Sequence, residues 1–114
     1  MPQLVVSARF VYVTTYDGPP WFSSVLHEER QAVADVEDAL RAWAKYTVVL
    51  RPDAADLILV VQRRPTEDVL AVYQRGGSIP LWRGMKEGGL SSKELPLMAN
   101  FRKAVETAEI QNQR

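Results

Sequence analysis

The stretch Asp53–Gln62, DAADLILVVQ, decides the fold of this 114-residue chain. It contains the only run of five consecutive large aliphatic residues, Leu57 to Val61. Pro52 precedes the run and Arg63-Arg64-Pro65 follows it, so the run is too short for a buried helix. A strand of this composition needs apolar neighbours on both faces. We therefore predict that it is the central strand of a small sheet.

Length and composition indicate a single domain spanning residues 1–114. Hydrophobic residues make up 46% of the chain and charged residues 25%, which are ordinary values for a globular protein. The 14 basic and 14 acidic side chains cancel, so only a local patch could attract nucleic acid or an anionic membrane. The absence of cysteine excludes disulfides, thiolate nucleophiles and cysteine-ligated metals.

The amino-terminal residues show no signal peptide, because Met1-Pro2-Gln3 leads directly into a strand pattern. Two interpretations stay open. Either the protein is cytoplasmic, or the sequence is that of a mature domain with an added initiator methionine.

A long first strand is predicted for Leu4–Thr15, which is rich in β-branched and aromatic residues. Alternation divides this strand into two faces. One face carries Leu4, Val6, Ala8, Phe10 and Tyr12, and the other carries Val5, Ser7, Arg9, Val11 and Val13. Asp17-Gly18-Pro19-Pro20 then ends the strand, since proline has no backbone N–H to donate.

Two amphipathic helices are predicted from apolar residues at three-and-four spacing. The first begins near the capping candidates Ser23 and Ser24, ends near Lys45-Tyr46, and carries the stripe Val33, Val36, Leu40 and Trp43. The second covers roughly Pro96 to Ile110, with Leu97, Phe101, Ala104 and Ala108 as its stripe. Ser91-Ser92-Lys93-Glu94 has the form of a capping box, and Pro96 equally suits the first helical position.

Shorter strands are predicted at Thr47–Leu50, Val69–Gln74 and Ile79–Arg83, the last at a sheet edge because it contains proline. The order β-α-β-β-β(-β)-α predicts an α+β two-layer sandwich, a mostly antiparallel sheet with two helices on one face. The first strand leads into a crossover helix, so it can pair in parallel with a later strand.

No motif predicts a catalytic, cofactor or metal site. His27 is the only histidine, and without cysteine it cannot form a conventional zinc site. Asp35, Glu37 and Asp38 point in different directions on a helix, so we interpret them as a solvated face. The serines lack a nucleophile elbow and the glycines match no phosphate-binding motif. A non-enzymatic role is favoured, and an enzyme of unrecognised type is the alternative.

Basic and aromatic residues gather at strand ends late in the chain, a combination that single-stranded nucleic-acid or sugar-binding surfaces use. The group consists of Arg63, Arg64, Tyr73, Arg75, Trp82, Arg83 and Lys86. Glu67, Asp68 and Glu87 interrupt it, so solvated strand ends with Trp82 in the core are the favoured interpretation.

Trp21 and Phe22 also have two interpretations. They cap the core as a hydrophobic staple before the first helix, which we favour, or they form an exposed contact patch.

Helices on one face leave the other face of the sheet uncovered. Val5, Val11, Val13 and one side of the central strand are expected to remain apolar there. We predict that the chain uses this face, or a strand edge, to form a homo-oligomer such as a dimer or to bind another protein.

Nearly the whole chain resembles a group of small uncharacterised exported proteins of soil bacteria. The segments that carry the resemblance are FVYVTTYDGPP, EERQAVADVEDALRAWAKYTVVLRP, ADLILVVQRRPTEDVLAVYQ, LWRGMKEGGL and PLMANFRKAV. A proline-acidic segment before ADLILVV and the later LWRG are also similar to envelope lipoproteins with a curli-assembly-type α/β domain. The resemblance implies a periplasmic or secreted location, and it brings no activity, cofactor or catalytic residue.

The function predicted from these features is a non-enzymatic interaction or accessory domain of the bacterial cell envelope that self-associates through a sheet face or edge. The alternative is a small nucleic-acid or polyanion binding protein that uses the basic and aromatic residues. Neither function needs a cofactor or a membrane span.

Overall fold

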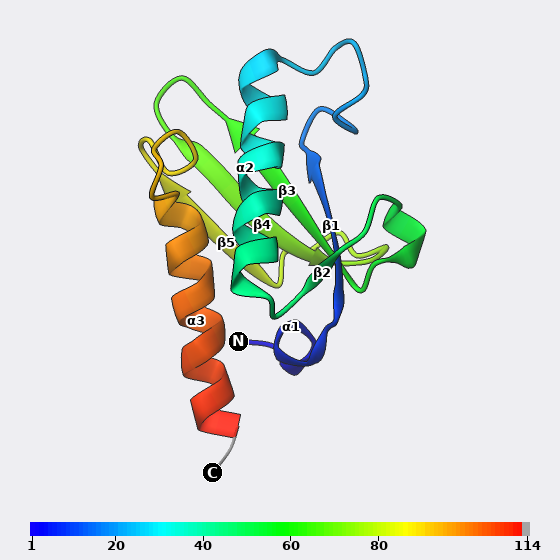
Figure 1. The fold of residues 1–114 in the computed structure, drawn as a ribbon, viewed down its shortest axis with the longest axis vertical. Helices are drawn as coiled ribbons and strands as arrows, with labels where there is room; N and C mark the ends of the chain where they lie inside the picture. Colours follow the sequence, from blue (N-terminus) through cyan, green and yellow to red (C-terminus); the bar gives the residue numbers. More distant parts are fainter. Residues whose placement is uncertain (113–114) are drawn as a thin grey trace.

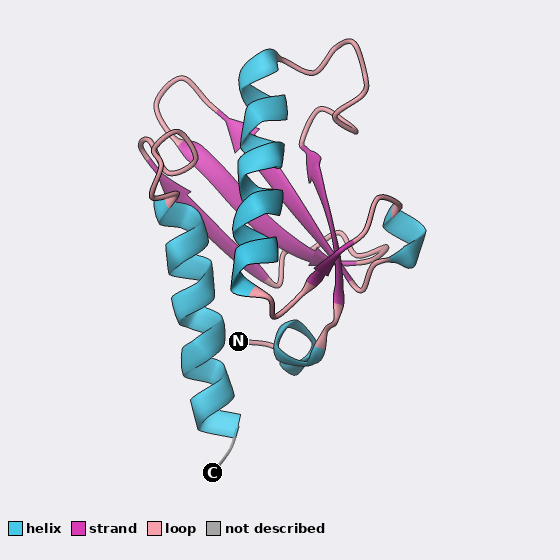
Figure 2. Cartoon of the chain, in the orientation of Figure 1, coloured by secondary structure: helices cyan, strands magenta, loops and turns pink. Residues whose placement is uncertain are grey.

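The computed structural model describes residues 1–112 and shows an α+β fold with a mixed five-stranded sheet and three helices (Figures 1 and 2). The strands are β1 (Phe10–Thr15), β2 (Thr47–Val48), β3 (Leu57–Arg63), β4 (Asp68–Gln74) and β5 (Trp82–Lys86). The helices are α1 (Gln3–Ser7), α2 (His27–Trp43) and α3 (Pro96–Asn112), and a 3₁₀ turn, η1 (Pro52–Ala54), precedes β3.

The aliphatic run forms the middle strand of the sheet, as the sequence predicts. The strand order is β2-β1-β3-β4-β5. On one side β3 pairs in parallel with β1, where Val11 faces Leu57, and on the other it pairs antiparallel with β4, where Leu59 faces Val72. Neighbours on both sides bury its backbone.

The expectation of a mostly antiparallel sheet holds only in part: β3–β4 and β4–β5 pair antiparallel, but β1 pairs in parallel with both β2 and β3, so the sheet is mixed. After α2 the chain returns along the sheet, so β2 runs in the direction of β1. The connection through η1 then carries the chain to the other side of β1 instead of forming a hairpin. The expected parallel pairing of the first strand is confirmed.

The hydrophobic core lies between one face of the sheet and the helices α2 and α3, which lie side by side on that face (Figure 1). Val11 and Val13 of β1, and Leu57 and Leu59 of β3, point into this core and are buried. The assignment of Val11 and Val13 to the uncovered face is therefore wrong. The register of β1 against β3 fixes which set of residues turns inward, and local alternation does not reveal it.

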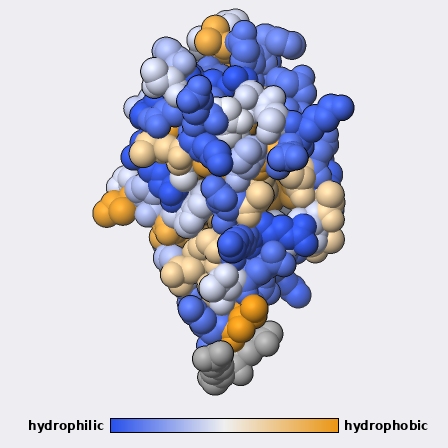
Figure 3. Space-filling view, turned by 90° about the vertical axis from the view of Figure 1, so that its left-hand side faces the viewer, coloured by the Kyte–Doolittle hydropathy of each residue, from blue (hydrophilic) through white to orange (hydrophobic). Residues whose placement is uncertain are grey.

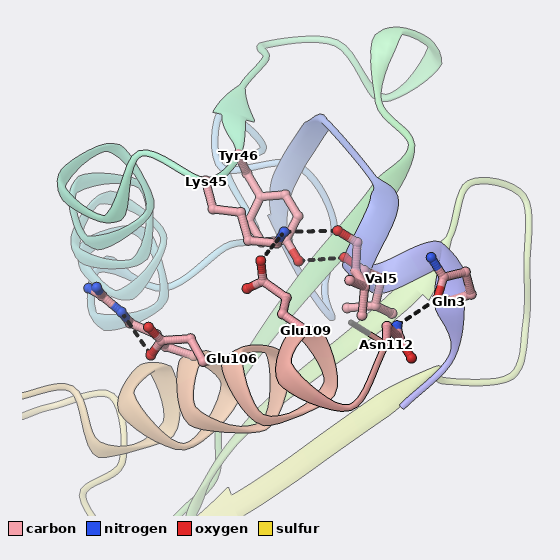
Figure 4. A network of polar contacts seen from close by, with 9 residues as sticks. Gln3, Val5, Lys45, Tyr46, Glu106, Glu109 and Asn112 are labelled. Carbon is pink, nitrogen blue, oxygen red and sulfur yellow. Dashed lines mark hydrogen bonds and ion pairs between the residues drawn. The ribbon is translucent and has the colours of Figure 1, made fainter. Parts of the chain in front are cut away.

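The first half of the predicted first strand is instead the short helix α1 (Gln3–Ser7), in which Val5 is fully buried. Two hydrogen bonds from residues that follow α2 hold α1 in place. The Tyr46 hydroxyl donates to the Val5 carbonyl at 2.6 Å, and Lys45 Nζ donates to the Val6 carbonyl at 2.8 Å (Figure 4). These partners lie 39 and 41 residues further along the chain. β-Propensity reports only local preference, and here tertiary contacts override it.

Helix α2 begins later than predicted, at His27, with Leu26 at the N-cap and no side-chain cap. Ser23 and Ser24 lie in the preceding turns and do not cap it. The helix ends at Trp43, where Ala44 adopts a left-handed conformation with φ of 64°. The predicted strand after it shortens to two residues, Thr47–Val48.

Helix α3 begins at Pro96, the first helical position, as one of the two interpretations predicts. The last strand is displaced from Ile79–Arg83 to Trp82–Lys86, so Pro80 stays in the connection before β5. Glycine at position 84 lets the sheet approach α3 closely, because a Cβ there would lie 3.0 Å from a methyl carbon of Leu97.

Candidate functional site

The face of the sheet turned away from α2 and α3 is largely apolar, and neither helix covers it (Figure 1). Residues on this side alternate with the core residues along β3, β4 and β5. We define the open sheet face by Ile58, Val60, Val69, Ala71, Tyr73, Arg83 and Met85. An uncovered apolar face is therefore present as predicted, and one side of the central strand belongs to it, but Val5, Val11 and Val13 lie in the core instead.

Exposure is uneven across the open sheet face. Val69 and Ala71 are only 4% and 3% exposed. Met85 is 50% exposed, and Ile58 and Val60 are half-buried. Within the open sheet face, Val69 and Ala71 are thus sheltered from solvent, whereas Met85, Ile58 and Val60 are accessible to a partner. By contrast, the side of the molecule that carries α3 is mainly hydrophilic, with hydrophobic side chains in small separate groups (Figure 3).

Two adjoining cavities indent this face. The larger has a volume of about 360 Å³ and is lined by Tyr16, Val60, Gln62, Arg64, Val69, Ala71, Tyr73, Pro80 and Arg83. The smaller, of about 270 Å³, lies between Ile58 and the glycines of the β4–β5 turn. Both cavities share Tyr16, Val60 and Tyr73, so they form one groove across β3 and β4.

The groove is positively charged. Arg64 and Arg83 are the charged residues that line its larger cavity, and no carboxylate of the described chain lines either cavity. Arg64 has one exposed ion-pair partner, Glu67, at 3.4 Å, a contact of small energetic weight. Arg83 forms no ion pair among residues 1–112. Two cations beside two tyrosine rings can bind an anion that has a flat apolar part.

The structure divides the predicted basic and aromatic group. Arg64, Tyr73 and Arg83 meet in the groove. Arg63 instead pairs with the buried Asp68 at 2.9 Å, and Arg75 donates to the Asp53 carbonyl at 2.8 Å.

The two remaining members of the group lie on the helix side of the sheet. Trp82 packs against Phe101 of α3 with ring centroids 5.2 Å apart, in agreement with the favoured placement in the core. Lys86 is exposed and pairs in register with Asp68, on the same side as Trp82.

Trp21 and Phe22 do not cap the core, since they are 67% and 48% exposed. Their rings contact each other edge to face at 6.3 Å, and the Phe22 ring lies against Gly18. Arg30 of α2 holds this segment by donating to the carbonyls of Pro20 and Phe22, both at 2.8 Å. Pro19 and Pro20 precede the two aromatic residues in this loop. Trp21 and Phe22 therefore form an exposed patch, which is the alternative interpretation of the sequence.

Sequence reasoning missed Tyr16 as a residue of the groove. Tyr16 directly follows β1, and its amide donates to the Val61 carbonyl at 3.0 Å, which extends the β1–β3 pairing by one residue. The even-numbered alternation of Tyr12, Thr14 and Tyr16 was the available signal. Ending the predicted strand at Thr15 hid it.

Comparisons with known proteins identify no relative: no family model matches the chain, and neither a curated protein nor a solved structure proves similar to it. Across residues 1–112, no helix is both long and apolar enough to cross a membrane. The same residues contain no group of three or more histidine, aspartate or glutamate side chains placed to hold a metal ion.

Proposed function

We propose that this protein is a non-enzymatic interaction domain that packs its open sheet face against a second copy of itself. The observation that carries the proposal is that the apolar Ile58 and Val60 of β3 are partly exposed on the side of the sheet that α2 and α3 leave uncovered. Removing such a surface from water stabilises association by about 25 cal/mol per Å². A place in the bacterial cell envelope, which the resemblance of the sequence implies, belongs to the same proposal.

A second copy fits this face because Ile58 and Val60, which lie on the middle strand of the sheet, are apolar and uncharged. Two-fold symmetry places the same patch on both partners. The partly exposed Ile58 and Val60 can then meet their counterparts without any buried unpaired charge, while Arg64 and Arg83 stay near the border. The groove also gives a partner side chain a place to insert.

The dimensions of the face predict weak association. The open sheet face covers three strands about 4.8 Å apart, the longest of seven residues, so it spans roughly 23 Å by 14 Å. This footprint is smaller than the area of about 800 Å² that each partner buries in a specific interface of standard size. We therefore expect a dimer that dissociates at low micromolar concentration.

Light scattering over a concentration series tests self-association. The wild-type mass should rise from 12.9 kDa towards twice that value as concentration increases. Val60→Lys should remain monomeric while keeping its circular dichroism spectrum, because a buried lysine at the interface has no partner. Ile110→Lys is the matched control, since Ile110 is 61% exposed on α3, and this variant should associate like wild type. A wild-type protein that stays monomeric at every concentration contradicts the proposal.

The groove also favours a second candidate function, the binding of single-stranded nucleic acid or another polyanion. Arg64, Arg83, Tyr16 and Tyr73 line one cavity without a carboxylate. Cationic contacts with phosphates weaken as salt rises, and aromatic rings can stack on bases.

Fluorescence anisotropy with a labelled single-stranded oligonucleotide tests the second function. Binding should weaken with salt, and Arg83→Gln should reduce it at every salt concentration. Lys86→Gln removes the same charge from the other side of the sheet and should bind like wild type. Absence of binding at low salt excludes this function, and it leaves self-association, which light scattering measures, unaffected.

A further inference from the structure

The outer edge of β5 is open. β5 is the last strand in the sheet order, so β4 pairs with only one of its two edges (Figure 1). Among residues 1–112, the backbone groups of Trp82 to Met85 that point away from β4 have no hydrogen-bond partner. The opposite edge of the sheet offers a much shorter site, since β2 contains only two residues. A row of unpaired backbone groups is a template on which another strand can pair.

This edge is accessible from outside the molecule. Arg83 and Met85 are exposed, and Gly84 between them carries no side chain that could hold a second strand away. α3 packs on the helix-side face of the strand, where Phe101 lies against Trp82. The contact with α3 therefore supports β5 and leaves its outer edge free.

A groove beside the start of β5 continues this edge. It has a volume of about 520 Å³ and lies between Leu81 and Trp82 on one side and Ala104 and Thr107 of α3 on the other. Side chains alternate along a strand, so a strand added to β5 directs every second side chain to the helix side of the sheet. An apolar side chain of that set can enter the groove. In recognition by strand addition, the backbone bonds supply affinity and such pockets supply specificity.

The basic residues along this edge have no acidic partners. Arg83 and Lys86 of β5 and Lys103 of α3 form no ion pair among residues 1–112. Lys103 lines the groove, no carboxylate lines it, and β5 contains no acidic residue. Pairing this edge with a second copy of itself brings four cations of the two strands together. The edge thus disfavours its own copy and favours an acidic strand.

We propose that the outer edge of β5 binds an extended acidic segment of another protein, which joins the five-stranded sheet as a sixth strand. The partner places acidic side chains beside Arg83, and apolar side chains that alternate with them enter the groove. The five residues of β5 set the length of the paired segment. This site uses a strand edge, so it does not depend on self-association through the open sheet face.

An NMR titration with a synthetic peptide tests the proposal. The probe is a capped peptide of alternating valine and glutamate, slightly longer than the five-residue β5. At low salt and a peptide concentration of ten times its Kd, the β5 amides that point away from β4 should exchange with solvent about tenfold more slowly. Absence of binding overturns the proposal. Binding that leaves the exchange of the β5 amides unchanged also overturns it, and indicates attraction of a polyanion without strand pairing.

N-methylated peptides separate strand pairing from charge attraction without altering the protein. In an added strand, every second amide donates to β5 and the amides between them point to solvent. Methylation of one alternate set of peptide amides should abolish binding, and methylation of the other set should leave it unchanged. Equal affinities of the two methylated peptides would contradict strand addition.

Charge variants test the acidic nature of the partner. Arg83→Gln should weaken binding of the peptide by up to about fivefold, as expected for an exposed charge pair. Thr107→Glu should also weaken it, because it places a negative charge in the groove. Lys93→Gln is the matched control and should bind like wild type, since Lys93 is an exposed cation outside the groove. Equal losses in Arg83→Gln and Lys93→Gln would overturn the assignment of this edge.

Discussion

Asp68 stands at the start of β4 with 3% of its surface exposed, on the side of the sheet that faces the core. One carboxylate oxygen accepts from Arg63 Nε and the other from the amide of Leu90, both at 2.9 Å. The side chain thereby ties the β3–β4 connection to the loop before α3. The sequence suggests a turn residue here, since nothing local reveals the Leu90 amide 22 positions later.

Asp68→Ala should lower the free energy of unfolding by roughly 2–3 kcal/mol, because it leaves the Leu90 amide buried without an acceptor and Arg63 without its counter-ion. Urea denaturation measures this change. Asp38→Ala removes an exposed carboxylate paired with Arg41 and is the control, with an expected change within about 0.5 kcal/mol. Equal effects of the two variants would contradict the role given to Asp68.

Gly89 lies in close contact with Leu97, where the loop before α3 meets the helix. A Cβ at Gly89 would lie 2.5 Å from Leu97 Cγ, so Gly89→Ala overpacks the junction of loop and α3. The cost should be about 1–3 kcal/mol. Combining it with Leu97→Ala tests the cause, because the smaller side chain makes room and the cost of the alanine at position 89 should shrink. A cost that is unchanged in the double variant would point to backbone strain instead.

At the scale of elements, α1 is held against the rest of the molecule by polar contacts from two other segments. Tyr46 and Lys45 bind its carbonyls, Lys45 also pairs with Glu109 of α3 at 3.5 Å, and Asn112 donates to Gln3 at 2.7 Å (Figure 4). Burial raises the pKa of the Tyr46 hydroxyl well above its ordinary value of 10.0, and the charge of Glu109 adds to this. The hydroxyl therefore stays a donor in the folded protein.

This shift predicts a loss of stability at alkaline pH. Above about pH 10 the unfolded chain releases the Tyr46 proton while the folded chain keeps it, so the free energy of unfolding falls as pH rises. Tyr46→Phe should cost about 1 kcal/mol at neutral pH, through the lost bond to Val5.

The same variant should also show a smaller fall in stability between pH 8 and pH 11 than wild type, measured by urea denaturation. Part of the fall should remain, because burial raises the pKa of Tyr12 as well. Tyr16→Phe, which changes an exposed ring, is the control and should keep the wild-type fall. An unchanged fall in Tyr46→Phe would contradict the assignment.

At the scale of the whole molecule, the elements that the sequence predicts well are those whose pattern is complete within one segment. The stripe of α2 and the aliphatic run of β3 both carry their own signal. The parallel pairing of β1 and the helix α1 depend on partners tens of residues away, and local pattern does not contain them. For the same reason, the sequence predicts Val11 and Val13 on the uncovered face, whereas the pairing of β1 with β3 places them in the core.

In the candidate site, too, some residues could be grouped from the sequence and others are brought together only by the fold. Arg64, Tyr73 and Arg83 could be grouped from the sequence, because one antiparallel meander brings them together. Tyr16 joins them only through the β1–β3 pairing. Glu29 lies in the first turn of α2, and only the fold shows that its side chain is buried.

The central position of β3 also has a kinetic consequence. Its antiparallel partner β4 follows after a four-residue turn, whereas Val11 of β1 pairs with Leu57, 46 positions later (57 − 11). Closing the longer loop costs more chain entropy, so the β3–β4 hairpin should be organised first in the folding transition state and β1 should dock last. Stopped-flow measurements should then find that Leu70→Ala mainly slows folding and that Val13→Ala mainly speeds unfolding. Because β1 docks last in folding, β1 and the Tyr16–Leu26 segment that follows it should be the first part of the molecule to detach from the sheet in unfolding.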